Sequence, residues 1–230
     1  MNKQRTLNNT KLDDSDLDML QNPNQYQRLL RKDIVHSYYE YYLNGVIGEA
    51  DQYIELISAL RDASPTDEFV IRINSVGGDL ATALAIINAI KETQAHVVGF
   101  IEHLAASAAT LIFLNCHSWG VAEDAEMMMH TSSSFYGGKE HEQFAYVDFS
   151  RKKIHKLLKK HYSGFLSVEE IDRVLKGEDI YLDSDEILER LEGFAQYQQE
   201  LYLAEMEALE NEQNAVVDAT VTKKKKILMS

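Results

Sequence analysis

Four short segments carry the side chains in this sequence that could do chemistry. Ser107 lies among four alanines, His130 ends a run of three methionines, and Asp179 precedes the short apolar stretch 180–182. The fourth segment, 74–79, contains two adjacent glycines. A hydroxyl nucleophile is weak until a base removes its proton, and the base needs a third group to fix its tautomer. Ser107, His130 and Asp179 are therefore the residue types of a hydrolytic site built on a serine.

Each of these segments also has a plainer structural interpretation. The glycine pair Gly77-Gly78 follows an apolar stretch and precedes a helical pattern, so it could be an ordinary turn or a place where backbone N–H groups meet a ligand. Ser107 could cap a buried helix. His130 could be a core residue, and Asp179 a solvated loop residue. Taken singly, each segment favours the structural interpretation, so the argument depends on the order of all four.

The hydrophobic pattern predicts the elements that must position these residues. Buried strands are expected at 69–73 and 97–101, with short strands near 118–122 and 126–129. Helices are expected at 49–62, 79–92, 108–114, 141–161, 167–176 and from 184 to about 213, and a strand with a turn at 39–45. Strands and helices that alternate with short links predict an α/β layered domain with parallel strands. Ser167 with Glu170 three residues later predicts a capping box.

Composition excludes several classes of function. The chain has 230 residues, 45% of them hydrophobic, which is typical of a globular protein. Its 23 basic and 37 acidic residues give a net charge of −14, which argues against nucleic acid as a partner. No apolar run approaches the roughly 20 residues of a membrane span. Cys116 is the single cysteine, which favours a reducing, cytoplasmic setting. No pattern indicates a metal or a cofactor.

Together, the four segments resemble a known family. The runs are Val70 to Gly78, Leu104 to Ala109, Met128 to His130 and Glu178 to Leu182. In this order they are similar to the proteolytic subunit of Clp protease (the ClpP family of serine peptidases), and most of all to phage-encoded members, some of which act as prohead proteases. The resemblance implies that Ser107 is the nucleophile, His130 the general base and Asp179 its orienting group. It also implies an oxyanion hole from the backbone N–H groups of Gly78 and Ala108.

The resemblance further implies an architecture. The expected fold is the ClpP/crotonase-like layered ββα superhelix with a protruding handle helix at 141–161. We expect a flexible arm at 1–35, a protease domain at 36–195, and an acidic helix with a basic tail at 196–230. The expected activity is endopeptidase cleavage of protein or peptide substrates inside a homo-oligomer of six- or seven-membered rings, with stacked rings as one option. A AAA+ unfoldase is a candidate partner, and capsid maturation is the alternative setting.

Departures from the family pattern keep other classes open. Val76 and Thr131 stand where the family usually has proline or has one close by, and phage relatives frequently have glutamate in place of Asp179. Peptidases of the signal peptide peptidase A type share the glycine turn and the serine block but use lysine as the base. Crotonase-like enzymes share the architecture and act on coenzyme A thioesters without needing a serine at 107. A scaffold protein that has lost activity is the remaining alternative.

Overall fold

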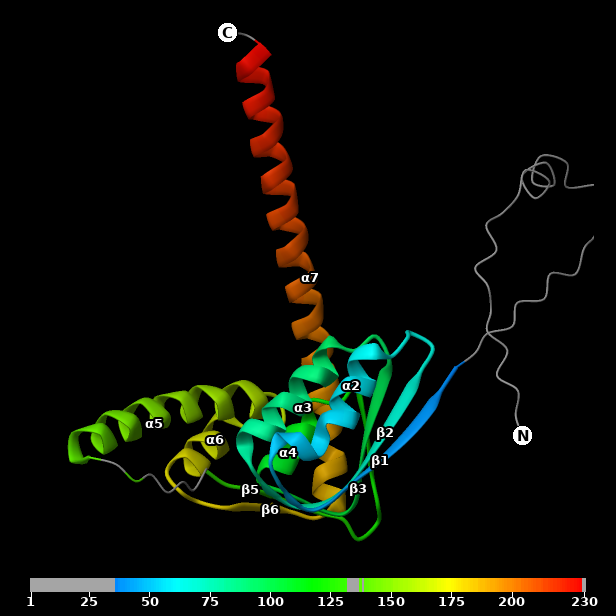
Figure 1. Cartoon of the computed structure of the whole chain (residues 1–230), viewed down its shortest axis with the longest axis vertical. Helices are drawn as coiled ribbons and strands as arrows, with labels where there is room; N and C mark the ends of the chain where they lie inside the picture. The colour runs from blue at the N-terminus through cyan, green and yellow to red at the C-terminus, as the bar shows by residue number, and fades with distance from the viewer. Residues whose placement is uncertain (1–35, 132–136, 138, 229–230) are drawn as a thin grey trace, which may run out of the picture. The chain divides into compact units, whose positions relative to one another are not determined.

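The structure is a computed structural model that describes residues 36–131, 137 and 139–228 (Figure 1). The arm expected at 1–35 lies outside the described residues. The elements are β1 (Tyr38–Ile47), a short 3-10 helix η1 (Ala50–Tyr53), α2 (Ile54–Asp62), β2 (Glu68–Gly78), α3 (Leu80–Glu92), β3 (His96–Ala106), α4 (Ala108–Leu114), β4 (Ser118–Val121), β5 (Glu126–Met129), α5 (Glu140–Tyr162), α6 (Val168–Leu175), β6 (Ile180–Leu182) and α7 (Ser184–Leu228).

Six strands form one sheet in which the order is β1-β2-β3-β5-β6, and β4 also pairs with β3. All pairs are parallel except β5 with β6, which run antiparallel. The prediction of an α/β fold with parallel strands is therefore confirmed. The antiparallel edge strand β6 was not predicted, because a run of three residues carries no information on strand direction.

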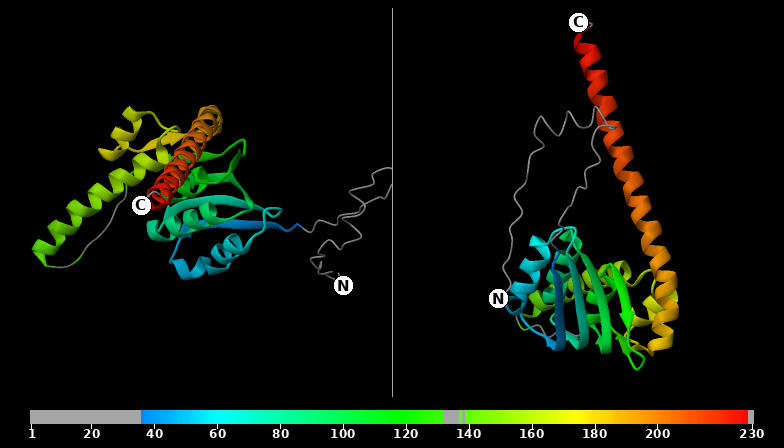
Figure 2. Two further views of the ribbon diagram at one scale, coloured as in Figure 1. Left: turned by 90° about the horizontal axis from the view of Figure 1, so that it is seen from above. Right: turned by 90° about the vertical axis from the view of Figure 1, so that its right-hand side faces the viewer.

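The sheet is covered by helices on one face. In β2 the side chains of Phe69, Ile71 and Ile73 are at most 1% exposed, whereas Val70 and Arg72 between them are partly exposed. This alternation is the period of two that places successive side chains on opposite faces of a strand. Helices α2, α3 and α4 lie against the buried face (Figures 1 and 2).

The first two strands run further than the sequence predicts. Instead of a turn at Asn44-Gly45, β1 continues to Ile47 with a register shift against β2 between Gly45 and Val46. Gly45 has a φ of 72°, which glycine adopts at no steric cost. The prediction of a turn here is wrong because a bulge uses the same residue types. As a result, β2 stays paired up to Gly78, and the glycine pair ends the strand.

Helix α5 leaves the layers and extends away from them (Figure 1). Only its last turns are anchored, where Leu157, Leu158, His161 and Tyr162 are buried. Helix α7 is also longer than predicted and continues past residue 213 to Leu228. It runs without a break through residues 195 and 196, where we expected the protease domain to end. Its first turns pack on the domain, where the Phe194 ring lies 5.2 Å from that of Trp119.

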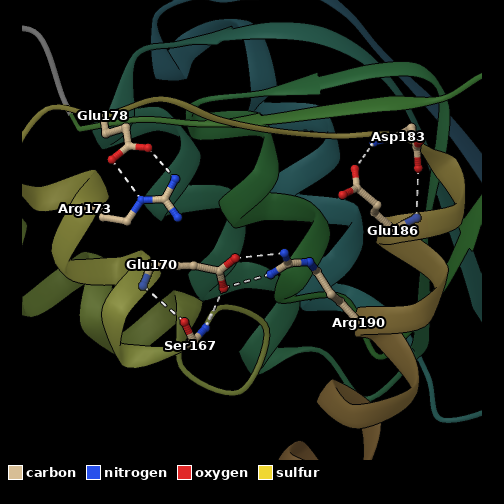
Figure 3. A network of polar contacts seen from close by, with 7 residues as sticks. All are labelled: Ser167, Glu170, Arg173, Glu178, Asp183, Glu186 and Arg190. Atoms are coloured by element: carbon tan, nitrogen blue, oxygen red, sulfur yellow. Dashed lines mark hydrogen bonds and ion pairs between the residues drawn. The ribbon is translucent and has the colours of Figure 1, made fainter.

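Reciprocal polar contacts fix the connection from α6 to α7 (Figure 3). Ser167 and Glu170 form the predicted capping box. Arg190 donates two hydrogen bonds to the Glu170 carboxylate, at 2.8 and 2.9 Å, and this pairing lowers the pKa of Glu170 to about 2. Arg173 pairs with Glu178, the residue before Asp179. The Arg173–Glu178 pair therefore holds the chain immediately before Asp179.

Candidate active site

Ser107 occupies the turn between β3 and α4 in an unusual backbone conformation. Its φ of 54° and ψ of −122° make it the one non-glycine residue with positive φ within the described residues. Such a conformation costs about 1–3 kcal/mol and persists only where its surroundings impose it. The Ser107 amide donates to the carbonyl of Met128 in β5 at 2.8 Å, which ties the turn to the neighbouring strand.

The Ser107 hydroxyl is directed at an imidazole. Its Oγ lies 2.7 Å from Nε2 of His130, and Ser107 makes no side-chain capping bond to α4. The parallel pairing of β5 with β3 sets this distance, because Ala106 lies opposite Met128 and the two chains leave the sheet side by side. Ser107 stands at the N-cap position of α4 but does not cap the helix with its hydroxyl. The structure brings two of the three expected side chains together.

Asp179 directly precedes the strand that pairs with β5. β6 runs antiparallel to β5, and its last pair is Ile180 with Met129, so Asp179 and His130 are the next residues of the two chains beyond the paired register. In the described part of the chain no hydrogen bond or ion pair joins the exposed Asp179 carboxylate to the imidazole. Asp179 therefore follows the paired strands on the same end of the sheet as His130 and is not bonded to it.

The glycine pair packs directly against the nucleophile turn. A Cβ on Gly77 would lie 2.6 Å from the carbonyl oxygen of Ala106 and 2.8 Å from Cβ of Ser107, and its φ is +84°. No other residue type fits this approach. The Gly77 amide donates to Ser75 Oγ at 3.1 Å, and Ser75 Oγ donates to the Gly45 carbonyl at 2.7 Å.

This arrangement separates the roles of the two glycines. The amide of Gly77 is already engaged, which leaves Gly78 as the glycine whose amide is the candidate oxyanion donor. The Ala108 amide is in the first turn of α4, where N–H groups have no partner within the helix. Sequence reasoning missed the part played by buried Ser75. The only available signal was a serine two residues before the glycine pair.

A cavity of about 800 Å³ opens beside Ser107 and His130. One wall is formed by the start of α3 and the other by α5, which contributes Tyr146, Phe149 and Ile154. The lining is mostly apolar, and Lys153 and Asp79 are its charged residues. The sequence did not indicate that α5 would line the site, because its apolar stripe is also that of a helix packed on a core. An apolar cavity with a few polar groups at one end is typical of a ligand site.

Two general features bear on the chemistry. Among the described residues, no group of three or more histidine, cysteine, aspartate or glutamate side chains is placed to hold a metal ion. No helix of the described chain is long and apolar enough to cross a membrane. A serine on a strained turn with a histidine on its hydroxyl is the arrangement used by serine hydrolases.

Comparison with known proteins identifies the family. Residues 19–193 match the family model described as Clp protease, so the chain belongs to the Clp protease family, whose members are serine-type peptidases. The match begins at residue 19, whereas the sequence analysis expects the protease domain to begin at residue 36. A search of curated proteins found no match. Family membership decides for a peptidase of the ClpP type against a crotonase-like enzyme acting on coenzyme A thioesters.

Proposed function

We propose that this protein is a serine endopeptidase in which Ser107 is the nucleophile, His130 the general base and Asp179 the residue that orients His130. The observation that carries the proposal is the 2.7 Å contact between His130 Nε2 and Ser107 Oγ on a strained turn. Backbone strain at a non-glycine residue concentrates at functional sites, and this one turns the hydroxyl toward a base. The amides of Gly78 and Ala108 form the proposed oxyanion hole.

The reaction then follows from the geometry. Ser107 Oγ attacks the scissile carbonyl carbon while its proton passes to His130 Nε2, and the carbonyl oxygen becomes an oxyanion held by the two amides. The C–N bond breaks, and the leaving amine takes the proton from His130. Water then attacks the resulting ester on Ser107, again with His130 as base, and releases the acid.

The cavity supports a peptide substrate with an apolar side chain next to the cleaved bond. Leu80, Leu84 and Leu111 line it from one side, and Phe149 and Ile154 from α5 line it from the other. A side chain placed there would leave water for an apolar surface, which is favourable by about 25 cal/mol per Å². The substrate class is therefore unfolded polypeptide or peptide, because an extended chain can bring a single side chain into such a cavity.

We further propose that the protein assembles into six- or seven-membered rings, as the family resemblance implies. The first half of α5 supports an interface, because Phe144, Val147 and Phe149 are 57–70% exposed on a helix that projects from the domain. Exposed apolar groups gathered on one element mark interaction sites. Light scattering at two salt concentrations tests this proposal, and a monomer of 26.2 kDa under all conditions would contradict it.

The same proposal covers two settings. The peptidase works with a AAA+ unfoldase in the first, and matures a phage prohead in the second. Both settings use the same site. An enclosed chamber excludes folded proteins, so cleavage of a folded substrate would require an unfoldase, whereas cleavage of disordered segments would not. Assays of a folded protein and of the same protein unfolded, each without ATPase, separate the two settings.

Hydrolysis of a fluorogenic peptide by Ser107→Ala tests the proposed function. We expect kcat to fall by about 10⁶-fold, as for other triad nucleophiles. Ser118→Ala is the matched control, because Ser118 Oγ also contacts a histidine, at 2.9 Å from His96 Nε2, but lies outside the cavity. It should keep wild-type activity. Equal activity of Ser107→Ala and wild type would show that the protein is not a Ser107 peptidase.

A further inference from the structure

Two buried hydroxyl groups lie behind the nucleophile turn. Thr110 Oγ1 is 2.6 Å from the carbonyl oxygen of Ser107, and the phenol oxygen of Tyr162 is 2.8 Å from Thr110 Oγ1. Thr110 is 0% exposed and Tyr162 is 1% exposed. Tyr162 is the last residue of α5, so these two contacts join the anchored end of that helix to the turn that carries Ser107.

The direction of both hydrogen bonds is determined by chemistry. A hydroxyl has one proton to donate, and a carbonyl can only accept. Thr110 must therefore donate to the Ser107 carbonyl, and Tyr162 must donate to Thr110. Burial raises the pKa of Tyr162 to about 12, so its phenol keeps the proton that this arrangement needs.

The Ser107 carbonyl belongs to the same peptide unit as the Ala108 amide. A peptide unit is planar and trans, so its C=O and N–H point in opposite directions, and fixing one fixes the other. Donation to the carbonyl also polarises the unit, which strengthens its N–H as a donor. The Ser107 carbonyl also accepts a hydrogen bond from the Thr110 amide at 3.1 Å. Thr110 therefore donates two hydrogen bonds to this carbonyl, one from its hydroxyl and one from its amide.

We propose that Thr110 and Tyr162 are positioning residues that aim the Ala108 amide at the oxyanion of the reaction. This inference rests on the proposed function. Neither hydroxyl touches the reacting atoms, and both act through the peptide unit between Ser107 and Ala108. Their contribution is made in the transition state, where the oxyanion exists, and not in the bound substrate.

Kinetics of Tyr162→Phe, Thr110→Val and Thr110→Ser test the inference on the full-length protein. Losing the phenol hydroxyl should lower kcat by about tenfold while KM stays within about twofold, because the lost interaction strengthens only in the transition state. Affinity for a peptide boronate, whose tetrahedral adduct on Ser107 mimics the oxyanion, should fall by the same factor as kcat/KM. Thr110→Ser keeps a hydroxyl and should recover most of the activity that Thr110→Val loses.

Tyr53→Phe is the matched control. Tyr53 is 7% exposed and its hydroxyl accepts a hydrogen bond from the Gly48 amide at 3.2 Å, remote from Thr110. It should leave kcat and boronate affinity unchanged. The double variant Tyr162→Phe/Thr110→Val should be no slower than Thr110→Val alone, because both act through one chain of bonds.

Three results would overturn the inference. They are a folded Tyr162→Phe protein with wild-type kcat, an equal loss in Tyr53→Phe, and a rise in KM without loss of kcat. Each of these can occur while Ser107→Ala is inactive, and the proposed function then stands. A wild-type protein that neither cleaves peptide nor binds the boronate would instead remove the proposed function and this inference together.

Discussion

His130 Nε2 and Ser107 Oγ lie 2.7 Å apart although 23 residues separate them in the chain. The two residues leave the sheet from β5 and β3, whose parallel pairing ends next to them. The Ser107 amide is bound to the Met128 carbonyl, so main chain and side chain of the serine both contact the β5 segment. The contact is therefore a consequence of strand pairing, and any change that shifts the turn should separate the two atoms.

Gly77→Ala should abolish activity and destabilise the fold. The added Cβ would meet three atoms of the nucleophile turn at 2.6–2.9 Å, two of them backbone atoms, at a φ that alanine rarely adopts. We expect a loss of about 2 kcal/mol or more in the free energy of unfolding. Chemical denaturation and peptide hydrolysis measure both effects.

Gly193→Ala is the control for this prediction. Gly193 lies inside α7, and a Cβ there meets no atom within 4 Å. Alanine should raise stability by about 0.5–1 kcal/mol through its better helix propensity and leave activity unchanged. If Gly77→Ala behaves like Gly193→Ala, the close packing of the glycine pair on the turn is not required.

Asp179→Asn should lower kcat by about a thousandfold or more with little change in stability, because an orienting carboxylate holds the imidazole in the tautomer that can accept the proton. Stopped-time peptide assays and thermal melting measure the two quantities. Asp172→Asn is the control, since the half-exposed Asp172 side chain pairs with Lys159 at 3.7 Å. An Asp179→Asn protein as active as the control would reduce the site to a Ser-His pair.

In the Glu170→Gln protein, the free energy of unfolding should depend less on pH in the acid range. Glutamine can keep the capping contacts but not the ion pair with Arg190, in which the side chains are 20% and 26% exposed. The pKa of Glu170 is lowered to about 2 by Arg190, so its stabilisation is present above pH 4.5 and is lost as pH falls toward 2. We expect wild type to be more stable by about 1–2 kcal/mol at pH 7, after allowance for solvent screening.

Denaturation curves of both proteins at several pH values should converge as pH approaches 2. Glu178→Gln is the comparison, because its pair with Arg173 is half exposed on both sides and should contribute less. A constant difference between wild type and Glu170→Gln across this pH range would mean that the ion pair does not cause the stabilisation.

The sequence predicts the layers of the fold and the residues of the site, because apolar periodicity and residue type are local properties. Strands at 69–73 and 97–101 and the capping box at Ser167 all appear in the structure. The extensions of β1 and β2 were missed, since Gly45 and Gly78 favour turns and bulges alike. The continuation of α7 to Leu228 was missed because its last turns have no regular apolar stripe.

Long-range hydrogen bonds were the part that the sequence could not predict. Thr110 and Tyr162 are 52 residues apart, and nothing in either segment indicates that their hydroxyls meet. The antiparallel pairing of β6 with β5, which brings the segment before Ile180 to the end of β5, is also a tertiary property. Motifs can name the reactive side chains, but the groups that orient them depend on how separate elements pack.

Peptide mapping after reaction with a fluorophosphonate, which modifies serines activated by a general base, tests the assignment of Ser107 and His130. We expect one adduct, on Ser107, and its loss in His130→Ala. Ser118 should stay unmodified, although it too contacts a histidine. An unlabelled Ser107, or equal labelling with and without His130, would contradict the assignment of Ser107 and His130 as nucleophile and base.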